Sequence, residues 1–160
     1  MTDIDRPTTA ERLSPTEFVV TRRVDAPVQA VFAAWAQPEL FRQWWAPASF
    51  GGTILSYEAD MRTGGSYRLV MAHPSLPEPM AFFGRYVEVV AGSRIVWTNE
   101  EAGEQGQVTT VSFTSEGGAT RIVVHERYPS PQALDEALAS GATSGWGEQF
   151  AQLDALIPTL

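Results

Sequence analysis

The sequence predicts an α+β fold in which one antiparallel sheet carries helices at its ends. Three observations predict this fold. The middle of the chain holds six short segments of alternating apolar and polar residues, separated by turns rich in glycine. Helical periodicity precedes this region and returns after it. The length of 160 residues suits a single domain whose core is large enough to enclose a cavity.

The chain begins with a polar stretch that we expect to be a flexible tail. Residues 1–15 contain two prolines and no apolar run, and Pro15 marks the expected end of the tail. The remaining residues, 16–160, are expected to form the single domain. Its first strand is predicted at residues 16–24, which are rich in threonine and valine.

Two short helices are predicted after this strand. Asp25 is expected to cap the first helix, with Pro27 in its first turn. Apolar residues between Val28 and Trp35 then follow at helical spacing. Pro38 ends this helix and opens the second one.

The strands of the sheet follow the helices. They are predicted at about residues 53–60, 65–72, 80–90, 93–100, 107–115 and 119–128. The glycines between most of these segments favour short turns, which join antiparallel neighbours. The loop at 73–79 holds three prolines and therefore cannot be a central strand.

The end of the chain returns to helical periodicity. Ser130 followed by proline resembles a helix cap and first turn. Trp146, Phe150, Leu153 and Ile157 then recur at i, i+4, i+7 and i+11. This spacing predicts one apolar stripe that faces the sheet.

Composition excludes several classes of function. The net charge is −8, which disfavours nucleic acid as a partner. The chain has no cysteine and no lysine, so thiolate catalysis, cysteine-ligated zinc and Schiff-base chemistry are excluded. The two histidines lack metal-ligand spacing, and we expect no metal and no cofactor. No secretory signal and no apolar run of about 20 residues are present, so we expect a cytoplasmic protein without membrane insertion.

Five segments carry a resemblance to a known family. They are residues 22–47, 60–71, 94–98, 120–128 and 145–157. In this order and spacing they resemble the AHSA1-like family, named for the activator of Hsp90 ATPase homologue, within the START/Bet v 1-like (SRPBCC) superfamily, and we expect a bacterial protein. The resemblance implies a helix-grip fold, in which a curved sheet wraps around a long C-terminal helix. It also implies a hydrophobic ligand cavity between the sheet and that helix.

The inner faces of the strands and of the last helix supply the predicted ligand-binding residues. Core packing is the alternative role for each aromatic side chain among them. The predicted ligand-binding residues are Trp35, Tyr67, Leu69, Met71, Trp97, Asn99, Val111, Phe113, Val124, Glu126, Trp146 and Phe150.

Glu126 is the one candidate catalytic residue. It follows Ile122 and Val124 at a spacing of two, so its side chain is expected to point inward, whereas His125 points outward. A carboxylate on an apolar face must be paired, hydrated or protonated. We favour a structural pairing of Glu126 with an arginine over a role as acid or base.

The predicted function is the binding of a small hydrophobic molecule, such as a lipid, by a carrier or sensor. A cyclase- or hydrolase-type enzyme that uses the same cavity is one alternative. The family resemblance implies the other, an Hsp90-type chaperone-associated interaction domain with a role in the stress response. The family's founding eukaryotic member carries an extra N-terminal domain for chaperone binding, whereas this sequence holds one domain after a short tail. Association with a second copy of the chain, as a homodimer, is the further possibility.

Overall fold

The computed structural model describes residues 8–100, 106–140 and 145–160 of the chain. Its strands form one antiparallel sheet in the order β1-β2-β8-β7-β6-β5-β4-β3. They are β1 (Thr8–Ser14), β2 (Glu17–Val24), β3 (Thr53–Ala59), β4 (Ser66–Ala72), β5 (Met80–Val90), β6 (Arg94–Thr98), β7 (Val108–Glu116) and β8 (Ala119–Arg127). The helices are α1 (Val28–Ala36), α2 (Pro38–Trp44), α3 (Pro131–Ser140) and α4 (Trp146–Leu156), with short 3₁₀ turns at Ala48–Phe50 and Ile157–Thr159.

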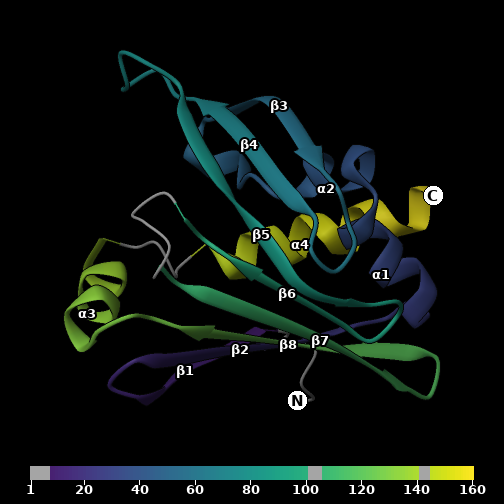
Figure 1. Ribbon diagram of the computed structural model, residues 1–160. Helices are drawn as coiled ribbons and strands as arrows, with labels where there is room; N and C mark the ends of the chain where they lie inside the picture. Colours follow the sequence, from purple (N-terminus) through teal and green to yellow (C-terminus); the bar gives the residue numbers. More distant parts are fainter. Residues whose placement is uncertain (1–7, 101–105, 141–144) are drawn as a thin grey trace.

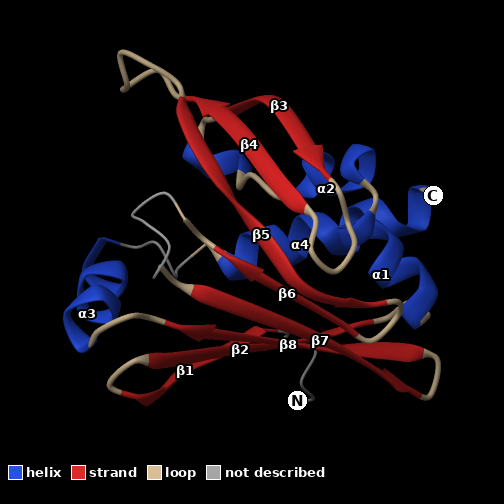
Figure 2. Cartoon of the chain, viewed as in Figure 1, coloured by secondary structure: helices blue, strands red, loops and turns tan. Residues whose placement is uncertain are grey.

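The sheet bends around helix α4. In Figure 1, β3 and β4 stand up from the layer formed by β1, β2, β8 and β7, and α4 crosses between these two parts. Helices α1 and α2 lie beside the C-terminal end of α4, whereas α3 lies at the opposite end of the molecule (Figures 1 and 2). This arrangement is the predicted α+β, helix-grip architecture, although the C-terminal helical region consists of two helices, α3 and α4.

Strand β5 carries the features that bend the sheet. Its register with β6 shifts between Tyr86 and Glu88, and such bulges bend a strand and increase its twist. Gly84 lies so close to β6 that a Cβ atom there would be 1.9 Å from the carbonyl oxygen of Thr98. Only glycine allows this approach of two backbones. The shift also turns Glu88 outward, where its carboxylate lies 2.6 Å from the guanidinium of Arg94.

The predicted flexible tail is wrong for residues 8–14. They form β1, which pairs antiparallel with β2 at the edge of the sheet. The Arg12 guanidinium lies 2.7 Å from the Asp135 carboxylate on α3, and Thr8 Oγ1 accepts a 2.8 Å hydrogen bond from Arg22. The side chains of β1 are mostly exposed, so this edge strand lacks the alternation that identifies a half-buried strand. Residues 1–7 of the predicted tail lie outside the described residues.

Helix α1 begins later than its sequence suggests. The predicted cap residue, Asp25, is exposed and lies 3.6 Å from the Arg23 guanidinium, while Pro27 occupies the N-cap position. At α3 the prediction is confirmed, because Ser130 Oγ accepts a 3.1 Å hydrogen bond from the amide of Ala133.

The core is organised around Trp35, which is 1% exposed. Trp35 belongs to α1, and residues of α2 and its C-cap, of strands β6 and β7, and of α4 contact its indole ring. Their ring centroids lie within 6.4 Å of the Trp35 ring, and they belong to Phe41, Trp44, Trp45, Trp97, Phe113, Trp146 and Phe150. Aromatic side chains therefore join every layer that meets at the centre of the molecule.

The apolar stripe of α4 faces this core, as predicted. Trp146, Phe150 and Leu153 are buried, and Ile157 is half-buried against the same cluster in the 3₁₀ turn after the helix. Burial of these side chains against the sheet holds α4 in place, since a short helix is marginal alone.

We expect Phe150→Ala to lower the free energy of unfolding by about 3–5 kcal/mol, because it leaves a cavity where a fully buried ring was packed. Urea unfolding followed by far-UV circular dichroism measures the loss. Leu55→Ala is the control, because Leu55 is 52% exposed on β3. It should cost less than about 0.5 kcal/mol. Equal losses in the two variants would contradict this packing.

Candidate functional site

A cavity of about 700 Å³ lies between the inner face of the sheet, helix α4 and the segment after α2. Eight of the predicted ligand-binding residues line it. They are Trp35, Tyr67, Leu69, Met71, Trp97, Asn99, Glu126 and Trp146. The sheet and α4 thus bring together side chains from five separate parts of the chain.

Four predicted ligand-binding residues lie in the core instead of at the cavity wall. They are Val111, Phe113, Val124 and Phe150, each 5% exposed or less. Helix α1 covers the part of β7 and β8 that carries the first three. The inner face of the sheet is therefore divided into a filled part and an open part, which strand alternation does not reveal.

The cavity also includes side chains that the sequence prediction missed. Among them are the aromatic residues Phe41, Trp45, Tyr57, Tyr86 and Tyr128. Tyr128 continues the alternation of Val124 and Glu126 by two residues, so that signal was present. The positions of Phe41 and Tyr57 depend on the contact between α2 and β3, which joins segments without any local pattern in common.

Glu126 lies on the inner face of β8, in register with Thr109 on β7 and Phe18 on β2. Only 6% of the residue is exposed. Its carboxylate accepts a 3.2 Å hydrogen bond from the Tyr128 hydroxyl and another from the side chain of Gln107. Burial raises the pKa of Glu126 to about 7, although these two hydrogen bonds act in the opposite direction.

The expected arginine partner of Glu126 is not found among the described residues. The buried arginine, Arg22, is in register with Ile122, four residues away along β8, and pairs with Asp154 of α4. The part of the chain that the structure describes thus does not provide the structural pairing that we favoured. His125 points to the outer face, as predicted, and its Nε2 atom lies 3.0 Å from Glu17.

Hydrogen-bonded neutral groups make up most of the other polar surface of the cavity. The Tyr67 hydroxyl donates to the carbonyl oxygen of Thr98 at 2.7 Å, and Asn99 Nδ2 lies 3.4 Å from Thr109 Oγ1. The hydroxyl oxygens of Tyr57 and Tyr86 are 3.3 Å apart. Burial raises the pKa of both phenols, so both stay protonated near neutral pH.

Polar side chains of α4 hold the segment after α2 against the cavity. Gln149 Nε2 donates to the carbonyl oxygen of Trp45 at 2.5 Å. Gln152 Nε2 donates to the carbonyl oxygen of Ala46 at 2.9 Å. Glu148 accepts hydrogen bonds from the amide and hydroxyl of Ser49, which lower the pKa of its carboxyl. Together these hydrogen bonds fix the wall before any ligand arrives.

Two further features of the described residues bear on function. They include no group of three or more histidine, aspartate or glutamate side chains that could hold a metal ion. None of their helices is long and apolar enough to cross a membrane. The arrangement suits the enclosure of an apolar molecule with a few hydrogen-bonding groups, together with one buried carboxyl group that can exchange a proton near neutral pH.

The stability of the protein should report the raised pKa of Glu126. In the unfolded chain this carboxyl ionises near 4.5, whereas in the folded protein it ionises near 7. The folded state therefore binds more protons between these values, and its free energy of unfolding falls as pH rises through this range. The glutamine of Glu126→Gln does not titrate. The free energy of unfolding of this variant, relative to that of the wild type, should therefore rise with pH, by on the order of 3 kcal/mol up to about pH 8.

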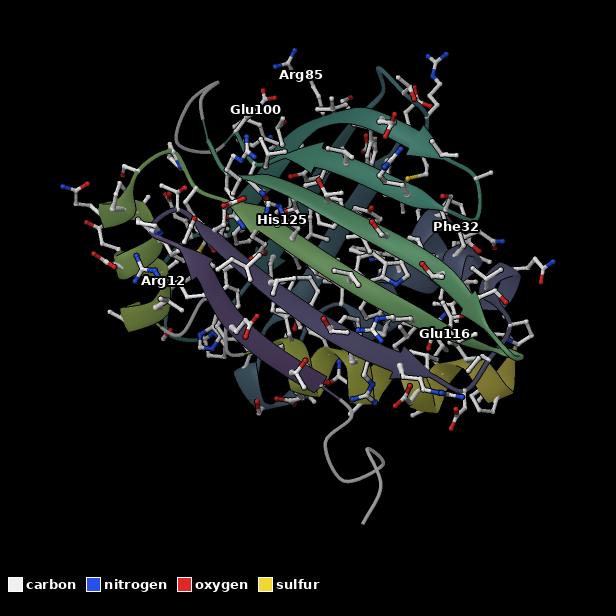
Figure 3. All side chains as sticks on the ribbon, turned by 90° about the horizontal axis from the view of Figure 1, so that it is seen from below. Arg12, Phe32, Arg85, Glu100, Glu116 and His125 are labelled. Carbon is white, nitrogen blue, oxygen red and sulfur yellow. The ribbon has the colours of Figure 1, made fainter. Side chains whose placement is uncertain are left out.

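Urea unfolding of both proteins at about pH 5 and about pH 8 measures this difference. Glu116→Gln is the control, because it removes the same charge at the opposite end of the β7–β8 hairpin from Glu126. In Figure 3, Glu116 lies far along the hairpin from His125, the residue next to Glu126. A pH-independent difference between Glu126→Gln and the wild type would contradict the raised pKa.

Solved structures with the same fold come from several bacteria. A protein from Rhodobacter sphaeroides is 20% identical, with a TM-score of 0.86 over 96% of this chain and 99% of the other. Protein Ms6760 from Mycobacterium smegmatis is 25% identical, with a TM-score of 0.80 over 96% and 99% of the two chains. An AHSA1-like protein from Aeromonas hydrophila is 19% identical, with a TM-score of 0.67 over 88% and 92%.

No curated protein is a significant match to the chain. The model of one protein family does match it, from residue 25 to residue 157. That range begins just before α1 and ends just after α4, so it contains the strands from β3 to β8 and nearly the whole cavity wall. The chain therefore belongs to the family described as activator of Hsp90 ATPase homolog 1-like protein.

Proposed function

We propose that this protein binds a small, largely hydrophobic molecule in the cavity between the sheet and α4, as a carrier or sensor. The observation that carries the proposal is the cavity itself, whose volume of about 700 Å³ is typical of small-molecule sites. AHSA1-like and other SRPBCC folds commonly bind hydrophobic ligands.

The composition of the wall supports a hydrophobic ligand. Of the 25 described residues that line the cavity, eleven are aromatic, and aromatic faces give a bound molecule a large contact area with little loss of side-chain freedom. Trp45, just after α2, and Trp146, at the start of α4, contact each other edge to face, with ring centroids 5.5 Å apart. Polar groups are few and mostly hydrogen-bonded within the protein, so the apolar wall supplies most of the contact area for a ligand and the polar groups orient it.

Native mass spectrometry of protein purified from its own host is the direct test. A ligand retained in the cavity should appear as a discrete added mass that is lost when the protein is denatured. The proposal would be contradicted if protein from several growth conditions showed the mass of the bare chain alone and also bound no dye.

A neutral dye, N-phenylnaphthylamine, should bind at one saturable site with increased fluorescence. Trp97→Ala should weaken this binding by roughly three- to tenfold, the loss expected for one aromatic contact. Phe83→Ala is the matched control, because Phe83 is 38% exposed and does not line the cavity, whereas its neighbour Phe82 does. Equal affinity in Trp97→Ala and Phe83→Ala would place the dye outside the cavity.

Catalysis in the same cavity is the second proposal, and the raised pKa of Glu126 favours it. An acid or base with a pKa near 7 is effective at neutral pH. A cyclase- or hydrolase-type reaction would use this carboxyl group to give or take one proton. Once a retained ligand is known, Glu126→Gln should bind it but leave it unchanged over time, while the wild type converts it. Conversion of the ligand by Glu126→Gln would contradict the catalytic proposal.

A contact with an Hsp90-type chaperone is supported by the family membership alone. Analytical ultracentrifugation of the protein with purified Hsp90 from its host tests it. The same experiment, with the protein by itself, tests the proposed homodimer. Independent sedimentation of the two proteins would remove the chaperone proposal.

A further inference from the structure

We infer that the ligand of this cavity is a hydrophobic organic cation: an amine attached to an aromatic or aliphatic body of a size that fits the enclosed space. This inference rests on the proposed ligand-binding function and names its ligand class. It distinguishes this cavity from a cavity that would bind fatty acids or other anionic amphiphiles.

The charge of the wall is the first argument. Of the lining residues in the described part of the chain, Glu126 and Glu148 are acidic, and none is arginine or histidine. The full sequence contains no lysine. A carboxylate or phosphate group on a ligand would enter a space of low dielectric constant without a counter-ion and beside Glu126, which is strongly unfavourable.

The incomplete environment of Glu126 is the second argument. Among the described residues, its carboxylate has hydrogen-bond donors from Tyr128 and Gln107 only, both neutral groups. An ionised carboxylate has about four acceptor positions, so others are left for a ligand. An ammonium group would supply both N–H donors and the positive charge that the described protein residues do not provide. Charge-assisted hydrogen bonds of this kind are stronger than neutral ones.

The aromatic wall is the third argument. A cation over the face of a tryptophan or tyrosine ring is attracted by the negative electrostatic potential of that face, and more strongly where water is excluded. Trp97 lies on β6 in register with Thr109, which is itself in register with Glu126 on β8. An amine held at Glu126 is therefore only two strands away from the Trp97 indole, and Tyr128 adjoins the same carboxylate.

The electric field of the whole protein acts in the same direction. The net charge of −8 attracts cations and repels anions within about a Debye length of the surface, roughly 8–10 Å at physiological ionic strength. Glu148, whose pKa is lowered by its hydrogen bonds to Ser49, keeps a negative charge at the cavity wall.

The other titratable groups around Glu126 do not change charge in the same way. Within the cavity, Tyr57, Tyr86 and Tyr128 have pKa values raised by burial and remain neutral near pH 7, and Tyr67 is hydrogen-bonded to Thr98. On the outer face of β2 and β8, His125 and Arg127 lie next to Glu17. A change in ligand affinity near pH 7 can therefore be assigned to Glu126 if it disappears in Glu126→Gln, which leaves His125 in place.

Three probes with one aromatic body and different charges test the inference: naphthylethylamine, naphthylethanol and naphthylacetic acid. Isothermal titration calorimetry with the full chain gives the affinity of each. At about pH 8 the amine should bind at least roughly tenfold more tightly than the alcohol, and the acid should bind more weakly than the alcohol. Lowering the pH to about 5.5 protonates Glu126 and should reduce the preference for the amine over the alcohol to about threefold or less.

Two variants assign the preference to one carboxyl group. In Glu126→Gln the amine and the alcohol should bind within about threefold of each other at both pH values, because the counter-charge is lost. In Glu116→Gln, which removes the same charge far along the hairpin, the preference of the wild type should remain. The wild-type pH series gives the same information without any substitution.

The outcomes distinguish this inference from the proposed function. Binding of the alcohol without a preference for the amine, or a preference that persists in Glu126→Gln, would overturn the inference and leave ligand binding intact. Tighter binding of the acid would overturn it as well. The absence of saturable binding by all three probes would overturn the proposed function together with the inference.

Discussion

The packing of the Trp35 indole is the constraint on which the rest of the structure depends. Trp35 comes from α1, but its ring contacts α2 through Phe41 and Trp44, the sheet through Trp97, and α4 through Phe150. One buried aromatic side chain of this size contributes several kcal/mol through burial, at about 25 cal/mol for each Å² of apolar surface. It also fixes the distance between the sheet and the helices, and one of its edges forms part of the cavity wall.

An ion pair between a buried arginine and a part-exposed aspartate reinforces this arrangement near the edge of the sheet. Arg22 of β2 binds Asp154 of α4 and Thr8 of β1, and its guanidinium carbon lies 6.0 Å from the centre of the Phe150 ring. Such a pair contributes less to stability than to the choice of one geometry, because the arginine charge must be removed from water. Here the pair ties α4 to β2, and Thr8 links the same guanidinium to the edge strand β1.

The cavity exists because the inner face of the sheet is covered unevenly. Where α1 lies over β7 and β8, side chains such as Val111 and Val124 are fully buried and the core is closed. Toward Glu126 the helices no longer fill the space. An unfilled cavity forfeits dispersion contacts, and the desolvation of Glu126 adds a further cost. A fold that retains both costs in one place is consistent with a binding site there, since functional sites commonly reduce stability.

The sequence by itself determined the order of the elements from β2 onward and which strand and helix faces point inward. Period-two alternation placed Tyr67, Trp97 and Glu126 on inner faces, and the spacing from Trp146 to Leu153 gave the buried face of α4. These features depend on local geometry, which a strand or helix imposes on neighbouring residues. Alternation was less informative for β1, because that strand packs almost no side chains against the core and is held by backbone hydrogen bonds at the sheet edge.

Only the tertiary structure decided which inward residues line the cavity and which fill the core. Phe113 and Glu126 have the same kind of position on neighbouring strands, yet α1 lies over the first and the cavity adjoins the second. Tertiary structure also paired Arg22 with Asp154 and, among the described residues, gave Glu126 two neutral hydrogen-bond donors. These outcomes depend on contacts between segments more than 90 residues apart, such as Thr120 with Ala26 and Gln149 with Trp45. No local period encodes them, because they follow from how the helices settle on a bent sheet.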